Sequence, residues 1–364
     1  MAAVRLRVIQ WATGNTGQRA LRELIRDPSY DLVGVRVYEQ AKEGVDAGEL
    51  CGEEATGVVA TTDRDTILKL SADCCVYMAR ATGTGQTRAG LTQDELVDDV
   101  VALLEKGTNV VTTCTDLIAG AVRLSEANRT RILDACSRGN ASVWASGSDP
   151  GFVTETLPLA FLSIQRRVDL IEIEEFGDLS HRPSPHMVME QMRFGKPLEE
   201  FDPERRKNHL FGEYQPALTV LADLAGFDID EWTAEGGVAA AKEDLEIVAG
   251  KIEAGTAAAQ RIIVTGRSRG EDCVRFTQYG FVAVEVEPDW GLQPTGWRVR
   301  VHGDAPIDAR MPFPVPLDEL ASYVPAFNAN GPVNAIPYVC AARPGILTTE
   351  DLPHILVRGP RPAS

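Results

Sequence analysis

One turn near the start of the chain restricts the possible folds more than any other feature of the sequence. A strand-like stretch over residues 4–11 runs into Ala-Thr-Gly-Asn-Thr-Gly and then directly into a segment with helical periodicity. Ala12, Gly14 and Gly17 hold the positions of the three small residues in a nucleotide-binding strand–turn–helix unit. The unpaired N–H groups and the dipole at the start of such a helix attract phosphate. We therefore expect a pyrophosphate to bind at Ala12, Thr13, Gly14, Asn15, Thr16 and Gly17.

The next predicted strand, residues 31–38, ends at an acidic residue where such a unit keeps its ribose ligand. Glu39 follows Gly17 by about 20 residues, the spacing expected for a carboxylate that accepts the adenosine ribose hydroxyls. A solvated loop charge is the alternative interpretation. Arg36 and Lys42 lie nearby and are suited instead to a 2′-phosphate, so the sequence leaves the choice between NAD and NADP open.

Composition narrows the classes of partner and compartment. The chain has 364 residues, enough for two domains, and a formal net charge of −17, which argues against nucleic acid and anionic membrane as partners. It lacks a run of about 18 apolar residues that would predict a membrane span. Its seven cysteines are scattered, with neither a CxxC pair nor a histidine at ligand spacing. We therefore expect a cytoplasmic protein without disulfides and without a metal site.

Strands and helices alternate as far as residue 146. Further strands are predicted at 74–78, 109–113 and 142–146, and Thr92-Gln-Asp-Glu95 is a capping box that opens a helix. This alternation predicts an α/β fold with a doubly wound parallel sheet, a Rossmann domain over residues 1–150. The loops at the carboxyl ends of its strands should line one cleft. We therefore expect Ala79 and Thr113, which lie in these loops, to bind the cofactor as well.

A different pattern follows from residue 151. Strands are predicted at 168–174, 258–266, 273–282 and 296–301, and the polar segment between the second and third of these indicates a hairpin. We expect an inserted α+β domain with an antiparallel sheet over residues 151–325, used for substrate and homodimer contacts. Residues 326–364 should return to the Rossmann domain.

Several short segments spread over both domains resemble a known group of enzymes. These are the first turn and residues 42–52, 106–113, 147–152, 192–197, 250–255 and 333–337. With them the chain resembles the dihydrodipicolinate-reductase-like oxidoreductases, in the branch of 2,4-diaminopentanoate dehydrogenase and the native amine dehydrogenases. The histidine pair and Asp-Ala-Pro-Ser-Gly-Thr signature of authentic dihydrodipicolinate reductases is missing, which disfavours that activity.

The resemblance implies hydride transfer between a nicotinamide cofactor and a small amine or its imine or carbonyl counterpart. In this branch an acidic residue after the fourth strand of the alternating pattern faces the substrate nitrogen, which points to Asp116 and its neighbour Thr115 as catalytic residues. The relatives carry two glutamates there, so both residues are departures, and a helix cap is the alternative role of Asp116.

Two further polar residues are candidates for the cleft. Asn334 lies in an apolar segment and is suited to the nicotinamide carboxamide or to substrate, with a buried structural amide as the alternative. His181 lies in a predicted loop, either beside the substrate or simply on the surface. Two other functions stay open: reduction of a C=O or C=C bond without ammonia, and nucleotide binding without turnover.

Overall fold

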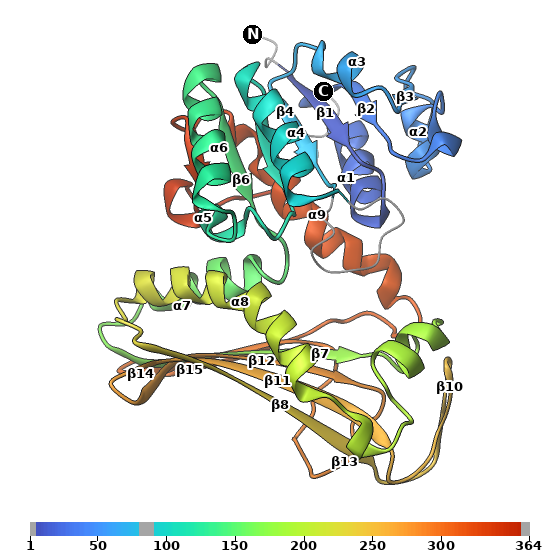
Figure 1. Cartoon of the computed structure of the whole chain (residues 1–364), viewed down its shortest axis with the longest axis vertical. Helices are drawn as coiled ribbons and strands as arrows, with labels where there is room; N and C mark the ends of the chain where they lie inside the picture. The colour runs from blue at the N-terminus through green and yellow to red at the C-terminus, as the bar shows by residue number, and fades with distance from the viewer. Residues whose placement is uncertain (1–4, 80–90, 358–364) are drawn as a thin grey trace. The chain divides into compact units, whose positions relative to one another are not determined.

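The computed structural model describes residues 5–79 and 91–357, which form two compact units (Figure 1). The first contains the residues up to Phe152 and those from Val324 onward, and the second runs from Val153 to Tyr323. No helix in the described ranges is long and apolar enough to cross a membrane.

A seven-stranded sheet forms the centre of the first unit, and all its neighbouring strands run parallel. In spatial order its strands are β16 (Gly345–Leu347), β6 (Ser142–Ala145), β5 (Asn109–Thr112), β4 (Cys74–Tyr77), β1 (Leu6–Trp11), β2 (Tyr30–Arg36) and β3 (Ala60–Thr61). The chain builds outward in both directions from β1, so the order reverses between β1 and β4. The predicted doubly wound sheet is confirmed, and ligands bind such sheets beyond the carboxyl ends of the strands at this reversal.

Helices cover both faces of this sheet. Figure 1 shows α4 and α6 in front of the sheet and α9 behind it. Apolar residues of α1 and α9, including Leu24, Val333 and Ile336, pack with Val8 and Val76 of the sheet in one buried cluster. The helices of this unit are α1 (Asn15–Arg26), α2 (Ala47–Cys51), α3 (Arg64–Leu68), α4 (Gln93–Glu105), α5 (Ile118–Ala121) and α6 (Glu126–Gly139), with short helices η1 (Gln40–Lys42) and η6 (Thr349–Asp351) and most of α9 (Leu320–Val339).

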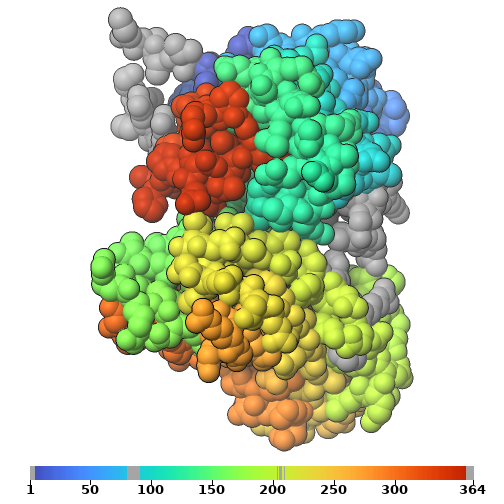
Figure 2. Space-filling view, turned by 60° about the vertical axis from the view of Figure 1, so that its left-hand side comes forward, coloured from blue at the N-terminus to red at the C-terminus, as the bar shows by residue number. Residues whose placement is uncertain are grey.

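The end of the chain completes the first unit. β16 pairs with β6, and the space-filling view shows the C-terminal residues (red) directly against the green surface near α6 (Figure 2). Ser142 on β6 donates its hydroxyl to the carbonyl oxygen of Arg343 at 2.9 Å. Residues 345–347 are therefore an edge strand of the parallel sheet.

The second unit contains another seven-stranded sheet, in the order β13-β8-β11-β12-β7-β14-β15. The predicted hairpin is confirmed as β11 and β12, which pair antiparallel. One pair departs from the expected antiparallel pattern, because β12 runs parallel to β7. The chain passes through α8 and several strands between these two, so no hairpin fixes their relative direction. The elements are η3 (Phe152–Thr156), α7 (Leu157–Leu162), β7 (Val168–Asp178), η4 (His186–Gln191), η5 (Leu198–Glu200), α8 (Pro203–Ala225), β8 (Glu231–Ala241), β9 (Leu245–Ile247), β10 (Gly250–Ile252), β11 (Ala257–Ser268), β12 (Glu271–Phe281), β13 (Val286–Glu287), β14 (Gly296–Gly303) and β15 (Ile307–Pro312).

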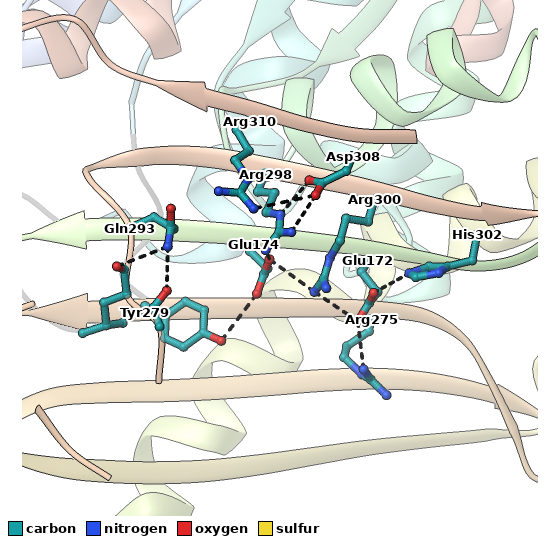
Figure 3. Close-up of polar contacts among 12 residues, drawn as sticks. Glu172, Glu174, Arg275, Tyr279, Gln293, Arg298, Arg300, His302, Asp308 and Arg310 are labelled. Carbon is teal, nitrogen blue, oxygen red and sulfur yellow. Dashed lines mark hydrogen bonds and ion pairs between the residues drawn. The ribbon is translucent and has the colours of Figure 1, made fainter. Parts of the chain in front are cut away.

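The two faces of this second sheet differ in chemistry. Ile171 and Ile173 of β7 pack with Leu218 and Leu221 of α8 in a buried core. Because strand residues alternate between the two faces of a sheet, the residues of β7 that alternate with these two isoleucines point to the opposite face. There, charged residues of β7, β12, β14 and β15, together with His302, form a continuous network of ion pairs and hydrogen bonds, called here the charged ladder (Figure 3). Its members are Glu172, Glu174, Arg275, Arg298, Arg300, His302, Asp308 and Arg310.

Candidate functional site

The turn after β1 has the geometry of an anion site. Gly14 precedes α1 as its N-cap without any side-chain hydrogen bond, and the first turn of the helix carries no acidic residue. The first N–H groups of a helix have no partner within the helix, and the dipole adds positive potential there. Gly14 and Asn15 are exposed, so this end of the helix is open to a ligand.

The two glycines of the turn have different surroundings. A Cβ atom added at Gly17 would lie 2.2 Å from the carbonyl oxygen of Ala12, so only glycine allows the helix to approach the turn this closely. A Cβ atom at Gly14 would meet no atom within 4 Å. Gly14 therefore borders open space at the start of α1, whereas Gly17 is closely packed.

A buried side chain supports the turn from below. Gln10 of β1 is fully buried, and its Nε2 donates to the carbonyl oxygen of Ala12 at 2.8 Å. Ala12 itself has φ of 71°, in the left-handed region that favours glycine. The hydrogen bond thus holds an otherwise unfavourable backbone conformation. This role of Gln10 was not predicted from the sequence, although a polar residue inside an apolar strand is a recognisable signal.

Opposite charges meet at the end of β2, where the ribose site was predicted. The Nζ atom of Lys42 lies 3.0 Å from the carbonyl oxygen of Thr13 and 3.3 Å from Glu39 Oε1. The side chain of Glu39 is 68% exposed and that of Lys42 only 21%. Arg36 instead stacks over the ring of Tyr38, with its Cζ 4.7 Å from the ring centroid. Lys42 therefore contacts both the turn after β1 and the predicted ribose ligand, Glu39.

A polar network buried under this region was not anticipated. Asp99 of α4 is 6% exposed and accepts hydrogen bonds from the hydroxyl groups of Tyr77 at 3.1 Å and Tyr38 at 3.5 Å. Trp11 donates its indole N–H to Tyr38 at 2.9 Å. Burial raises the pKa of the Tyr38 phenol to about 12 and holds the pKa of Tyr77 well above its ordinary value. The network joins the carboxyl ends of β1, β2 and β4 to α4.

The loop after β5 contains the predicted catalytic pair. Thr115 and Asp116 are both half-buried. Asp116 Oδ1 accepts a hydrogen bond from Gln93 Nε2 at 3.0 Å, and the thiol of Cys114 lies 3.7 Å from Oδ2. The N-cap of the following α5 is Leu117, with no side-chain hydrogen bond, so Asp116 is engaged by Gln93 rather than by a helix end.

The backbone beyond Asp116 is strained. Ala119, Gly120 and Ala121 have φ of 56°, 71° and 59°, three consecutive residues in the left-handed region. Left-handed conformations cost L-residues roughly 1–2 kcal/mol each, and such strain concentrates at functional sites. The loop after β5 therefore shares this feature with the turn after β1.

The remaining predicted residues lie in different parts of the two units. Ala79 is buried directly after β4, and the hydroxyl of Thr113 lies 3.3 Å from the sulfur of Met78. Asn334 lies on α9 beside Val333, whose carbonyl oxygen accepts a hydrogen bond from Tyr30 at the amino end of β2. His181 belongs to the second unit, where its Nδ1 lies 3.1 Å from the Ser180 hydroxyl on an exposed turn. Roles for these residues stay predictions.

An asparagine that the sequence analysis passed over lies closer to the strand ends than Asn334. Asn328 Oδ1 accepts hydrogen bonds from the backbone N–H and the hydroxyl of Ser148, at 3.1 and 2.9 Å. Ser148 follows the carboxyl end of β6. α9 therefore carries Asn328 to the edge of the sheet at which the first turn and Asp116 also lie.

Comparison with known proteins gives consistent relatives. The chain is 28% identical over 356 residues to an amine dehydrogenase of Streptomyces virginiae, which covers 95% of both proteins. The structure is similar to that of an amine dehydrogenase from Mycobacterium smegmatis, with a TM-score of 0.72, 18% identity and 97% of each chain covered. It is more distantly similar to a biliverdin reductase from Synechocystis solved with biliverdin and NADP+, with a TM-score of 0.51, 11% identity and 95% and 94% of the two chains covered.

A family model identifies the group to which the chain belongs. The model described as the 2,4-diaminopentanoate dehydrogenase C-terminal domain matches residues 152–358, more than half of the chain. The resemblance found in the sequence is thereby confirmed. This protein belongs to the 2,4-diaminopentanoate dehydrogenase family of NAD(P)-dependent oxidoreductases.

Proposed function

We propose that this protein transfers hydride between a nicotinamide dinucleotide and the carbon of a small amine or its imine counterpart. The observation that carries the proposal is the position of Asp116. Its carboxylate follows β5 at the same edge of the parallel sheet as the open turn after β1, and Gln93 holds it. The similarity to two amine dehydrogenases supports the same chemistry.

The residues of the first turn fit a dinucleotide. The uncapped start of α1 offers its N–H groups, Gly14 leaves space above them, and Gln10 fixes the backbone at Ala12. The backbone from Ala12 to Gly17 would hold the pyrophosphate, with Ala79 and Thr113 along the strand ends. When bound, the nicotinamide supplies the hydride acceptor or donor.

The charge pair after β2 suits either form of the cofactor. Glu39 can accept from free ribose hydroxyl groups, whereas a 2′-phosphate can take the place of Glu39 as the partner of Lys42. We infer that both NAD and NADP bind. Glu39→Gln should strengthen the binding of NADP relative to NAD, and Lys42→Met should strengthen the binding of NAD relative to NADP. Each change in the ratio of the two dissociation constants should be about tenfold or more, the worth of one charge-assisted hydrogen bond.

Asp116 provides the acid–base chemistry of the proposal. A carboxylate beside the substrate nitrogen stabilises the positive charge of an iminium ion and can accept or return a proton. The aspartate is one methylene shorter than the glutamates of the relatives, and Thr115 replaces the second acidic group. Thr115 therefore contributes a neutral hydroxyl where a second negative charge was expected.

This replacement also favours a second candidate function, reduction of a C=O or C=C bond without ammonia. With one carboxylate instead of two, the site holds less negative charge to stabilise a cationic nitrogen. Oxidation of NADPH and NADH is measured with a panel of aldehydes and ketones, with and without ammonium. The amine/imine proposal requires turnover that depends on ammonium, and equal rates in its absence would favour the second function.

The cofactor site is tested by adding atoms at Gly14. Gly14→Ala should fold normally, because the added Cβ meets no atom of the protein, yet weaken cofactor binding, and Gly14→Val should weaken it further. Gly212→Ala on α8 is the matched control, since its Cβ also enters open space. Dissociation constants come from quenching of protein fluorescence. A Gly14→Val variant that binds the cofactor as tightly as the parent would refute the assignment of the turn.

The charged ladder supports a homodimer. The whole chain carries a net charge of −17, which opposes association of two copies. The ladder is different, because Glu172, Glu174 and Asp308 face four arginines, Arg275, Arg298, Arg300 and Arg310. A surface with both signs interspersed can pair with itself across a two-fold axis. The ladder is therefore the face proposed to contact a second copy.

A further inference from the structure

Gln93 differs from the other residues near Asp116 because it comes from a separate element. It is the first residue of α4, and its side-chain amide donates to Asp116 Oδ1 across a sequence distance of 23 residues at 3.0 Å. Both side chains are half-buried. The sequence analysis placed Gln93 inside a capping box and gave it no role of its own.

The start of α4 is a rigid support for this side chain. Thr92 accepts from the backbone N–H of Glu95 at 3.2 Å, and Glu95 accepts from the backbone N–H of Thr92 at 2.7 Å. The next residue, Asp94, accepts from Asn128 of α6 at 2.8 Å, which ties the starts of two helices together. A residue between these anchors has little freedom, so Gln93 presents its amide from a fixed position.

The two oxygens of Asp116 have different partners. Oδ1 receives the strong N–H donor of Gln93, while Oδ2 has the weak thiol donor of Cys114 at 3.7 Å. Neither donor adds a formal charge to the site. A carboxylate anchored at one oxygen has a fixed plane and keeps the lone pairs of the other oxygen available to a second donor.

We propose that Gln93 is a positioning residue for the reaction: it anchors Oδ1 of Asp116 and thereby directs Oδ2 at the nitrogen of the substrate amine or iminium ion. The inference rests on the proposed function and adds a residue to it. An aspartate has a shorter reach than a glutamate, and its orientation therefore matters more for contact with the nitrogen. The anchor from α4 compensates for this by restricting the carboxylate to one direction.

Gln93→Met tests the anchor, because methionine has nearly the same length without a hydrogen-bond donor. The variant should lose about tenfold to a hundredfold in kcat for an ammonium-dependent reduction, the worth of one hydrogen bond to a charged group, while the dissociation constant of the cofactor stays at the parental value. Gln215→Met on α8 is the matched control, because it makes the same exchange at a half-buried glutamine whose amide donates to the Thr219 hydroxyl at 2.9 Å. Its kcat should stay within twofold of the parent.

A double-mutant cycle separates positioning from a general structural effect. Because Gln93 acts through Asp116, Gln93→Met should cause little further loss in hydride-transfer rate when Asp116→Asn is already present. Equal losses in both backgrounds, or a parental kcat in Gln93→Met, would overturn the inference and leave the proposed function intact. A parent protein that binds cofactor but shows no ammonium-dependent turnover would overturn the proposed function, and this inference with it.

Discussion

Three alanines among the described residues adopt the left-handed backbone conformation, and all three follow the carboxyl ends of strands in the candidate site. Ala12 belongs to the turn after β1, and Ala119 and Ala121 belong to the short, distorted α5 that follows β5. Each costs roughly 1–2 kcal/mol relative to an ordinary conformation, so the surrounding contacts must hold the loops in place. The two segments that bear the proposed cofactor and substrate groups therefore both contain strained alanines.

Glycine at these positions should stabilise the protein. Ala119→Gly removes the steric strain at φ of 56° and loses part of this gain to the greater freedom of glycine in the unfolded chain. We expect the free energy of unfolding to rise by about 1 kcal/mol, measured by urea denaturation. Ala102→Gly in the interior of α4 is the control and should lower it by about 1 kcal/mol. A loss of stability in Ala119→Gly as large as in this control would contradict the assignment of strain.

At the scale of single residues, the sequence could predict features that lie within one short segment. The turn with Ala12, Gly14 and Gly17 could be recognised from spacing alone, because all three lie in one short motif, and their role in cofactor binding stays a prediction. The contact of Gln93 with Asp116 joins two segments 23 residues apart, and no pattern within either segment encodes it. Asp99 was accessible to sequence reasoning, since it interrupts the apolar face of α4 between Leu96 and Leu103.

Among the elements, the buried phenols that join β2 and β4 to α4 make stability depend on alkaline pH. The folded protein keeps the proton of Tyr38 up to a pKa of about 12, whereas the unfolded chain releases it at the ordinary value of 10.0. The contribution of the neutral phenol to the stability of the folded state is therefore complete below pH 10. This contribution is lost as the pH rises from 10 toward 12. Tyr77 adds a loss in the same direction, because burial also raises its pKa.

We expect the free energy of unfolding to fall by on the order of 2 kcal/mol through Tyr38 between pH 10 and pH 12. Urea denaturation at a series of pH values measures this loss. Tyr38→Phe should show a smaller slope in that range, whereas Tyr323→Phe, at an exposed position, should keep the parental slope. Identical slopes for the parent and Tyr38→Phe would show that the phenol does not contribute.

Helix α9 illustrates why some elements cannot be predicted from local sequence. It contains Pro325, Pro332 and Pro337, each of which removes a backbone donor and disfavours a helix interior. The segment nevertheless remains helical where Val333, Ile336 and Val339 are buried against the sheet. Tertiary packing outweighs the local preference here. Segments without such conflicts could be predicted, since α1 was expected directly after the first turn and α4 at its capping box.

For the whole molecule, the charged ladder makes association a testable property. Arg298→Glu would place a third carboxylate beside Glu174 and Asp308, its present partners, and repel the matching face of a second copy. We expect the parent to be a dimer by light scattering and the variant to be a monomer. Arg138→Glu on α6, which also loses an ion pair, is the control and should stay dimeric. A parent that stays monomeric at high concentration would refute the proposed interface.

The parallel sheet of the first unit could be predicted, because its strands alternate with helices that form right-handed crossovers. The parallel pair of β7 and β12 could not, because residues about 100 positions apart meet there without a connecting turn. The chemistry of the reaction likewise came from motifs shared with relatives rather than from the arrangement of strands, since one fold supports many activities.

The contrast between the two glycines of the first turn has a practical consequence for engineering. Position 17 tolerates no side chain without moving the helix, so a library randomised there should yield mostly chains that fail to fold. Position 14 has room, and the same randomisation should return folded proteins graded in coenzyme affinity. Two glycines three positions apart therefore differ in use: position 14 can be varied to adjust coenzyme affinity, and position 17 must stay glycine for the chain to fold.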